Sequence, residues 1–249
     1  MKPLVSLILT TYNCRQDFIL TMESIQSQDY QRIEIIIKDG VSTDGTLDEI
    51  ENYRKTSKYP IVLQSEPDEG IFDAMTRGVK LSSGDIIAIC NERYLRDDAV
   101  STLVQSIEGH PGVVGAHCDL DYMEGDKVIR RWRMGEGTIS QGWLPGHPAL
   151  YLKREIYEKY GYYKPEYKIA ADYEFMIRFL KDGQNQLAYI PEVLIGMYYG
   201  GTSTSGLKSY IDSFKEGYRA LRDNQVRHAL WVNIRRTFRV MSQFRNQAG

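Results

Sequence analysis

The chain has 249 residues, of which 42% are hydrophobic and 26% are charged, and its formal net charge is −2. These values are those of an ordinary globular protein, and the near-neutral charge offers nucleic acid no general attraction, so we expect no nucleic-acid partner. The three cysteines, Cys14, Cys90 and Cys118, are too widely spaced for a metal-ligand pattern or a disulfide framework. The sequence has no signal-peptide layout and no apolar run long enough for a membrane span, so we expect a cytoplasmic protein.

Strands and helices are predicted to alternate over the first 118 residues. This rhythm favours a doubly wound, mostly parallel sheet with right-handed crossovers. The run Ile86–Cys90 is apolar without alternation, which is typical of a central strand covered on both faces. The strands are expected at 4–10, 33–38, 61–64, 86–90 and 113–117, and the helices at 17–28, 46–55, 71–81 and 97–108.

The rhythm changes after about residue 120. The later segments predict an α+β half, which together with the first half forms one domain over residues 1–205. Its two halves would be residues 1–118 and 119–205, followed by a helical extension over 206–249. The strands are expected at 127–133, 149–152, 187–190 and 193–198, and the helices at 154–160, 170–181 and 207–222.

The last 26 residues contain no Asp or Glu but five arginines. On a helical wheel their apolar residues share one face, with arginines beside it, which is typical of a basic amphipathic helix. Such a helix over residues 225–245 would lie on an anionic membrane surface. It could equally pack on its own domain or on a dimer partner. The apolar face comprises Val226, Leu230, Ile234, Phe238 and Met241, and the arginines beside it are Arg235, Arg236 and Arg239.

Polar loops follow three of the predicted strands, at 10–13, 39–46 and 91–94. The carboxyl ends of parallel strands meet at one sheet edge, and a crevice there suits a nucleotide. Asp39 would accept hydrogen bonds from a base or ribose, and Gly40 and Gly45 would let backbone amides approach closely. The alternative for Asp39 and Asp44 is turn chemistry, because Asp-Gly is a common turn pair.

Taken together, these blocks resemble the family 2 inverting glycosyltransferases of the GT-A fold, of the bacterial polysaccharide type. The resemblance covers residues 3 to about 205, and several blocks occur in the right order. They are Val5–Asn13, Ile35–Thr46, Glu69–Gly78, Ser83–Ile87 with Asn91, His147-Pro148, Ala171–Glu174 and Gly200–Ser203.

The resemblance assigns roles to residues of this chain. In that family the first two loops hold the nucleotide of a sugar donor, and a carboxylate that opens a late helix is the general base, which corresponds to Asp172. An inverting transfer needs one base to take the proton of the acceptor hydroxyl. The alternative for Asp172 is a helix cap. The predicted donor-side residues are Thr11, Tyr12, Asn13, Asp39, Asp44, Asp73, Arg77, Asn91 and Arg93.

One block departs from the family pattern. Family members usually carry Asn-x-Asp-Asp after this strand, where an aspartate binds the divalent metal that bridges the donor diphosphate; here the segment is Asn91-Glu92-Arg93-Tyr94. A hard cation such as Mn²⁺ or Mg²⁺ needs oxygen ligands. Three hypotheses remain: Glu92 binds the metal from a shifted position, Arg93 or Arg77 replaces the metal, or catalysis is lost.

On the acceptor side, His147, Trp143 and Arg178 are candidate contacts of the acceptor or the diphosphate. Trp132 is a second candidate for stacking on sugars, the segment 130–133 could meet a phosphate-bearing acceptor, and the loop 200–205 could be a lid.

The sequence thus predicts transfer of a hexose from a UDP or GDP sugar to a glycan or lipid-linked acceptor, at the inner face of a membrane. The alternatives are a non-catalytic nucleotide-sugar-binding protein and a sugar nucleotidyltransferase.

Overall fold

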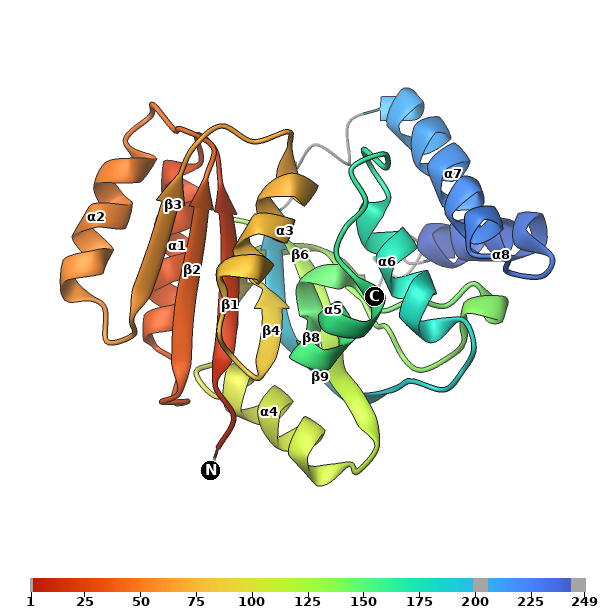
Figure 1. Ribbon diagram of the computed structural model, residues 1–249, viewed down its shortest axis with the longest axis horizontal. Coiled ribbons are helices and arrows are strands. Elements are labelled where there is room, and N and C mark those ends of the chain that lie inside the picture. Colours follow the sequence, from red (N-terminus) through yellow and green to blue (C-terminus); the bar gives the residue numbers. More distant parts are fainter. Residues whose placement is uncertain (1, 199–205, 243–249) are drawn as a thin grey trace.

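The computed structural model describes residues 2–198 and 206–242. In these residues the strands form one nine-stranded sheet with the order β3-β2-β1-β4-β8-β6-β9-β5, and β7 pairs with β6 (Figure 1). The strands are β1 (Val5–Thr11), β2 (Ile33–Asp39), β3 (Ile61–Ser65), β4 (Ile86–Ile89), β5 (Arg93–Tyr94), β6 (Val113–Glu124), β7 (Lys127–Trp132), β8 (Leu150–Lys153) and β9 (Gln186–Tyr198).

The first half of the sheet is parallel, as predicted. β1 lies between β2 and β4, with Val5 opposite Ile33 on one side and Ile86 on the other. The strand order therefore reverses between β1 and β4, which in open α/β sheets is the point where ligands bind. Every residue of β4 is buried, as its unbroken apolar run indicates.

Beyond β4 the sheet is mixed. β6 and β9 are parallel, but β8 runs antiparallel to both β4 and β6, and β5 and β7 are also antiparallel to their partners. Two expected boundaries are wrong. β6 continues past His117 to Glu124, because it pairs with β9 along most of its length. The strands expected at 187–190 and 193–198 form one strand, β9. Its register against β6 shifts next to Pro191, which has no backbone N–H to donate to the neighbouring strand.

The helices cover both faces of the sheet (Figure 1). Residues of α1, α2 and α4 pack with one face, and residues of α3, α5 and α6 pack with the other. The helices are α1 (Arg15–Gln26), α2 (Thr46–Thr56), α3 (Ile71–Leu81), α4 (Ala99–Gly109), α5 (Arg154–Tyr160), α6 (Ala171–Leu180), α7 (Gly206–Asp223) and α8 (Ala229–Ser242), with short 3-10 helices η1 (Ile139–Gln141) and η2 (His147–Ala149).

The helix predicted at 71–81 illustrates how the sequence sets this packing. Met75 and Val79 are buried one turn apart on α3, as their spacing indicates. Gly78 lies between them, and a Cβ at this position would be 2.4 Å from Cγ2 of Ile8 on β1. Glycine therefore sets the close approach of α3 to the sheet.

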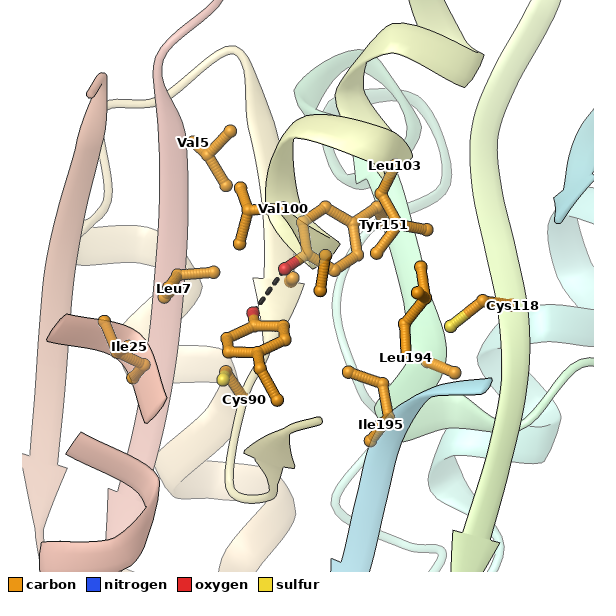
Figure 2. Packing of buried hydrophobic residues seen from close by; sticks show 14 of the residues in the cluster. Val5, Leu7, Ile25, Cys90, Val100, Leu103, Cys118, Tyr151, Leu194 and Ile195 are labelled. Carbon is orange, nitrogen blue, oxygen red and sulfur yellow. Dashed lines mark hydrogen bonds between the residues drawn. The ribbon is translucent and has the colours of Figure 1, made fainter. Parts of the chain in front are cut away.

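Figure 2 shows part of the core on the opposite face, where Leu7, Cys90 and Tyr151 lie among apolar side chains. The hydroxyls of Tyr94 and Tyr151 are hydrogen-bonded to each other there. Burial raises the pKa of the Cys90 thiol to about 12, so Cys90 is a core residue, as predicted.

The C-terminal helices pack on the rest of the domain, α7 against α6 and α8 against α7 and η1. Over residues 229–240 of α8 the buried positions are Val232 and Asn233, whereas Leu230 and Phe238 of the predicted apolar face are 48% and 67% exposed. Among the described helices, none has the length and apolar character that a membrane span requires. The loop 200–205, expected to act as a lid, lies outside the described residues.

Candidate active site

Asp39 ends β2 and organises the loop that follows. Its buried carboxylate accepts hydrogen bonds from Thr11 Oγ1 (2.9 Å), Ser42 Oγ (2.6 Å) and Ser65 Oγ (2.8 Å), and from the Ser42 N–H (3.0 Å). Burial raises the pKa of Asp39, but these hydrogen bonds outweigh burial and leave the pKa below its usual value. Asp39 is thus a fixed carboxylate at the sheet edge, and its contact with a donor stays a prediction.

Asn13 and Asp44 join the loops that follow β1 and β2. Asn13 has a left-handed backbone (φ 47°), and its Oδ1 accepts the N–H of Thr43 at 2.8 Å. Asp44 accepts the N–H and the hydroxyl of Thr46 at 3.0 and 2.6 Å, and the N–H of Arg15 at 3.0 Å. These are turn and capping contacts, which was the alternative left open for Asp44.

Lys38 was missed in the sequence, although a lysine after three isoleucines is unusual for a buried strand. Its side chain is fully buried, and Nζ donates to the carbonyl oxygens of Asp39 (2.9 Å) and Glu66 (2.6 Å). Nζ also lies 3.7 Å from Oδ2 of Asp68. Lys38 thereby fixes the loop between β3 and α3 beside the first two loops.

Asn91 brings the third predicted loop to the first. Its Oδ1 accepts the N–H of Thr10, and its Nδ2 donates to Thr10 Oγ1, both at 2.8 Å. The next residue, Glu92, accepts the N–H of Tyr198 through Oε2 at 2.9 Å. Burial raises the pKa of Glu92 to about 7.

The arginines proposed to replace a metal have other partners. Arg77 forms ion pairs with Asp73 (2.8 Å) and Glu66 (2.7 Å). Arg93 donates to the carbonyl oxygen of Gly125 (3.0 Å) and pairs with Asp126 (3.1 Å), at the turn between β6 and β7. The pKa of Asp73 is raised by burial and lowered more strongly by the Glu69 N–H and Arg77, so it stays below its usual value.

A cleft of about 450 Å³ joins the end of β4 to the start of α6. Asn91 and Glu92 line it from β4, and Ile71 and Phe72 line it from the first turn of α3. Asp172 lines the same cleft from the first turn of α6. The structure therefore brings together the predicted base and the segment after β4. Of the predicted site residues, Asn91, Glu92, His147 and Asp172 are among the lining residues. The others are not: Thr11, Tyr12, Asn13, Asp39, Asp44, Asp73, Arg77, Arg93, Trp143 and Arg178.

Asp172 and His147 both line this cleft. Asp172 Oδ1 accepts the N–H of Tyr173 at 2.7 Å, a contact that orients the carboxylate. His147 Nε2 is 2.8 Å from the hydroxyl of Tyr163. Burial lowers the pKa of His147, and the nearby charge of Asp172 opposes that effect. His147 is thus favoured in its neutral form.

Glu216 of α7 is a second residue that the sequence did not reveal. Its carboxylate accepts three successive backbone N–H groups, those of Lys168 (3.0 Å), Ile169 (2.8 Å) and Ala170 (2.9 Å). These groups precede α6 and have no partner within that helix. Glu216 therefore fixes the segment that delivers Asp172 to the cleft.

Trp143 and Arg178 have structural contacts instead of facing the cleft. Trp143 is buried, and its Nε1 donates to the carbonyl oxygens of Met134 and Gly135. Arg178 pairs with the buried Glu174 at 2.9 Å and donates to the carbonyl oxygen of Tyr160. A tryptophan or arginine has the chemistry of a ligand contact, but its sequence position does not tell which way it faces.

Trp132, one of the two tryptophans considered for stacking on sugars, lines the cleft. Its ring stacks on Tyr122, with ring centroids 6.4 Å apart. The guanidinium of Arg130 lies 4.5 Å from the centroid of Tyr122. Arg133, in the same segment, forms an ion pair with Asp121 at 2.8 Å.

Two arginines of α8, Arg236 and Arg239, also line the cleft. The helical wheel predicted that both arginines lie beside the apolar face of the helix, but it did not predict that they line a cleft.

The side chains of the described residues do not form a metal centre. In this part of the chain no group of three or more His, Cys, Asp or Glu side chains could hold an ion. Glu92 supplies one carboxyl to the cleft, which falls short of the six or more oxygen ligands that a hard cation usually takes.

Comparison with known proteins agrees with this geometry. The model of the Glycosyl transferase family 2 matches residues 6–182. A PGL/p-HBAD biosynthesis glycosyltransferase of Mycobacterium bovis (strain BCG / Pasteur 1173P2) is 26% identical over 212 residues, which cover 82% of this chain and 80% of the relative. An uncharacterized glycosyltransferase of Mycobacterium tuberculosis (strain ATCC 25618 / H37Rv) is 30% identical over 188 residues, which cover 71% and 68%.

Solved structures show the same fold. S. aureus TarS (residues 1–349) in complex with UDP-GlcNAc has a TM-score of 0.74 at 18% identity, covering 98% of this chain and 74% of TarS. The mannosyltransferase PcManGT from Pyrobaculum calidifontis, in complex with GDP-Man and Mn²⁺, has a TM-score of 0.65 at 17% identity, covering 100% and 76%. Because the family model spans most of the chain and the fold is GT-A, the protein belongs to glycosyl transferase family 2 and is a glycosyltransferase.

Proposed function

We propose that the protein transfers a hexose, with inversion, from a UDP or GDP sugar to a hydroxyl of a glycan or lipid-linked acceptor. One observation carries this proposal: Asp172 lines the same cleft as Asn91 and Glu92, which follow β4 at the point where the strand order reverses. The donor and the base would thus meet in one cavity.

The donor side of the proposal rests on the loops after β1, β2 and β4. Tyr12 is 68% exposed, and its ring lies beside Gly40, where a Cβ would be 3.2 Å from Tyr12 Cδ2. An open aromatic face beside close backbone suits a nucleotide base. The solved structures of TarS with UDP-GlcNAc and of PcManGT with GDP-Man support a nucleoside diphosphate sugar as the donor.

The proposed reaction uses Asp172 as general base. Its Oδ1 is engaged by the Tyr173 N–H, and within the described residues Oδ2 makes no hydrogen bond, so Oδ2 can accept the proton of the acceptor hydroxyl. The hydroxyl oxygen attacks the anomeric carbon, a new glycosidic bond forms, and the bond from that carbon to the donor phosphate breaks. Nucleoside diphosphate leaves from the opposite face, which inverts the configuration.

A non-catalytic nucleotide-sugar-binding protein is the second candidate, favoured by the loss of the usual acidic residues after β4. A protein that only binds nucleotide sugars does not need a carboxylate that two separate sets of contacts hold in the cleft. Asp172 has both: the Tyr173 N–H orients it, and Glu216 fixes the segment before it. These contacts favour the enzyme.

The exposed face of α8 supports an acceptor presented at a membrane. Trp231 and Phe238 are 64% and 67% exposed, and Arg235 lies between them on the same side of the helix. Exposed aromatic rings together with arginine suit the interface of an anionic bilayer. A dimer partner is the competing occupant, and a vesicle-binding experiment described below separates the two.

Calorimetric titration of the purified protein with UDP, and then with GDP, tests the donor proposal. Each titration is run with Mn²⁺ and repeated with EDTA. We expect one of the two nucleotides to bind, and Asp172→Asn to bind it with equal affinity. Binding that requires Mn²⁺ would make Glu92 the first metal ligand to substitute. Binding of neither nucleotide under either condition would contradict the proposed donor class.

A further inference from the structure

Part of the cleft wall consists of two aromatic rings that the proposed reaction does not use. Tyr122 of β6 and Trp132 of β7 line the same cleft as Asp172. Leu120 of β6 lies opposite Trp132, and Tyr122, two residues further along β6, points to the same face of the hairpin. The two rings are 12° from parallel, with their centroids 6.4 Å apart. They form an aromatic pair on the cleft wall.

Neighbouring side chains hold this aromatic pair in place. The guanidinium of Arg130 lies 4.5 Å from the ring centroid of Tyr122 and 5.8 Å from that of Trp132. Met197 of β9 lies opposite Tyr122 and also lines the cleft. Tyr122 is buried, whereas Trp132 is half-buried. Rings that are already ordered by packing lose little conformational freedom when a ligand binds, so the pair is preorganised as a binding surface.

Trp132 differs from Trp143 in its indole N–H. Nε1 of the buried Trp143 donates to the carbonyl oxygens of Met134 (3.0 Å) and Gly135 (3.1 Å). Nε1 of the half-buried Trp132 makes no hydrogen bond within the described part of the chain. Trp132 therefore offers a ligand an apolar ring and one hydrogen-bond donor at the edge of that ring.

Polar groups lie next to the aromatic pair. Met197, opposite Tyr122, precedes Tyr198, whose N–H donates to Oε2 of Glu92 at 2.9 Å. The pair is thus close to the segment that follows β4. Burial raises the pKa of Tyr122, and the nearby charge of Glu92 adds to that effect, in agreement with this placement. A ligand on the pair would therefore meet apolar rings on one face and a carboxyl group at its edge.

We propose that Trp132 and Tyr122 form a platform on which the pyranose ring of a substrate sugar stacks. This deepens the proposed function and rests on it. A pyranose ring carries C–H groups on its faces, which pack on aromatic rings, and hydroxyls at its edge, which bond to an indole N–H or a carboxyl group. The transferred hexose of the donor and the sugar of the acceptor share this chemistry, and both must enter the cleft for transfer.

Replacing Trp132 with leucine, which is apolar but has no flat ring, tests the platform in two binding experiments. Calorimetry compares the affinity for UDP and GDP with that for UDP-glucose, UDP-N-acetylglucosamine and GDP-mannose. Saturation-transfer NMR measures the binding of methyl glucoside, galactoside and mannoside to protein saturated with the nucleotide that it binds. We expect Trp132→Leu to weaken the binding of the nucleotide sugar or of the methyl glycoside about tenfold, with the affinity for free nucleotide unchanged. Loss in the first experiment assigns the platform to the donor sugar, and loss in the second assigns it to the acceptor sugar.

Two further variants serve as controls. Trp132→Phe keeps a flat ring and should retain most of the sugar binding, which would show that the loss in Trp132→Leu is not misfolding. Val128→Ala is the matched control, because Val128 lies on the same strand, is exposed and does not line the cleft. It should bind every ligand as the wild-type protein does.

The outcomes separate the platform from the donor proposal. Wild-type affinity of Trp132→Leu for every sugar would overturn the platform, and so would the absence of sugar binding by the wild-type protein. An equal loss of affinity for free nucleotide and for its sugar would assign a general structural role to Trp132 and would also overturn it. If neither nucleotide binds the wild-type protein, the donor proposal fails, and the methyl glycosides titrated without nucleotide still test the platform.

Discussion

Replacing Glu216 with alanine should separate the positioning of Asp172 from the binding of the donor. The Glu216 carboxylate accepts three backbone N–H groups at 2.8 to 3.0 Å, immediately before α6. A hydrogen bond to a charged group contributes about 1.5 to 3 kcal/mol, and water can replace part of it where the segment is exposed. We therefore expect the free energy of unfolding to fall by about 3 kcal/mol, and not by the sum of three full bonds.

The same change should lower turnover more than it lowers donor affinity. The freed N–H groups belong to residues 168–170, and Asp172 follows two residues later. A displacement of about 1 Å at a reacting group can cost about 100-fold in rate, so we expect at least a tenfold loss of turnover. The affinity for nucleotide should stay unchanged, because the donor loops lie on other elements.

Steady-state transfer, nucleotide calorimetry and urea unfolding on one set of variants provide the assay. Asp212→Ala is the matched control, since Asp212 lies one turn earlier on α7 and makes none of these contacts. Glu216→Gln keeps one acceptor oxygen and should give intermediate values. A Glu216→Ala protein with lowered stability but wild-type turnover would refute the positioning role.

Three further predictions concern packing, pH and the membrane. Gly78→Ala should lower the free energy of unfolding, measured with urea, by about 1 to 3 kcal/mol, because the new Cβ would collide with Ile8 on β1. The control, Gly109→Ala, has open space around the new Cβ and should lower it by less than about 1 kcal/mol. The pKa of Glu92 is raised to about 7, so the folded state binds the extra proton and the free energy of unfolding falls as pH rises from about 4.5 to 7. Glu92→Gln should remove that fall, which amounts to about 3 kcal/mol by pH 8 in urea unfolding, and parallel pH profiles for both proteins would show the assignment to be wrong. Replacing both Trp231 and Phe238 with serine should abolish cosedimentation with phosphatidylglycerol vesicles, and neither the wild-type protein nor the variant should bind phosphatidylcholine vesicles. Unchanged sedimentation of the double variant would exclude the membrane face. A wild-type protein that forms a dimer and does not bind the vesicles would also exclude it.

The parallel half of the fold could be predicted from the sequence because its signals are local. The buried run after Gly84, the period of α3 and the polar residues at strand ends each occupy a few consecutive positions. Parallel strands then bring those ends together, and the hydrogen bonds between Asn91 and Thr10 confirm that two of the predicted loops meet.

The second half could not be predicted as well, because its order depends on long-range pairing. Nothing near Leu150 in the sequence indicates that β8 runs antiparallel between β4 and β6. Pro191 suggests a break, yet β9 continues past it, because β6 pairs with both sides and absorbs the irregularity.

The C-terminal helix shows the limit of periodicity most clearly. An apolar face on the helical wheel predicts that one side of the helix is buried. Over residues 229–240 of α8, however, the buried residues are Val232 and Asn233, and Phe238 of the apolar face is exposed. Which face packs depends on the surfaces of α7 and η1, and on the space left at Gly142. For the same reason, the entry of Arg236 into the cleft has no local signal in the sequence.

Release of nucleoside diphosphate from a panel of UDP and GDP sugars, compared between wild type and Asp172→Asn, tests the central claim most directly. With water or an added glycan as acceptor, wild type should turn over at least one donor, and Asp172→Asn should lose that turnover at least 1,000-fold while calorimetry gives the same donor affinity. Turnover at the wild-type rate in Asp172→Asn would contradict the assignment of the base. Absence of turnover in wild type, with intact donor binding, would favour the non-catalytic alternative.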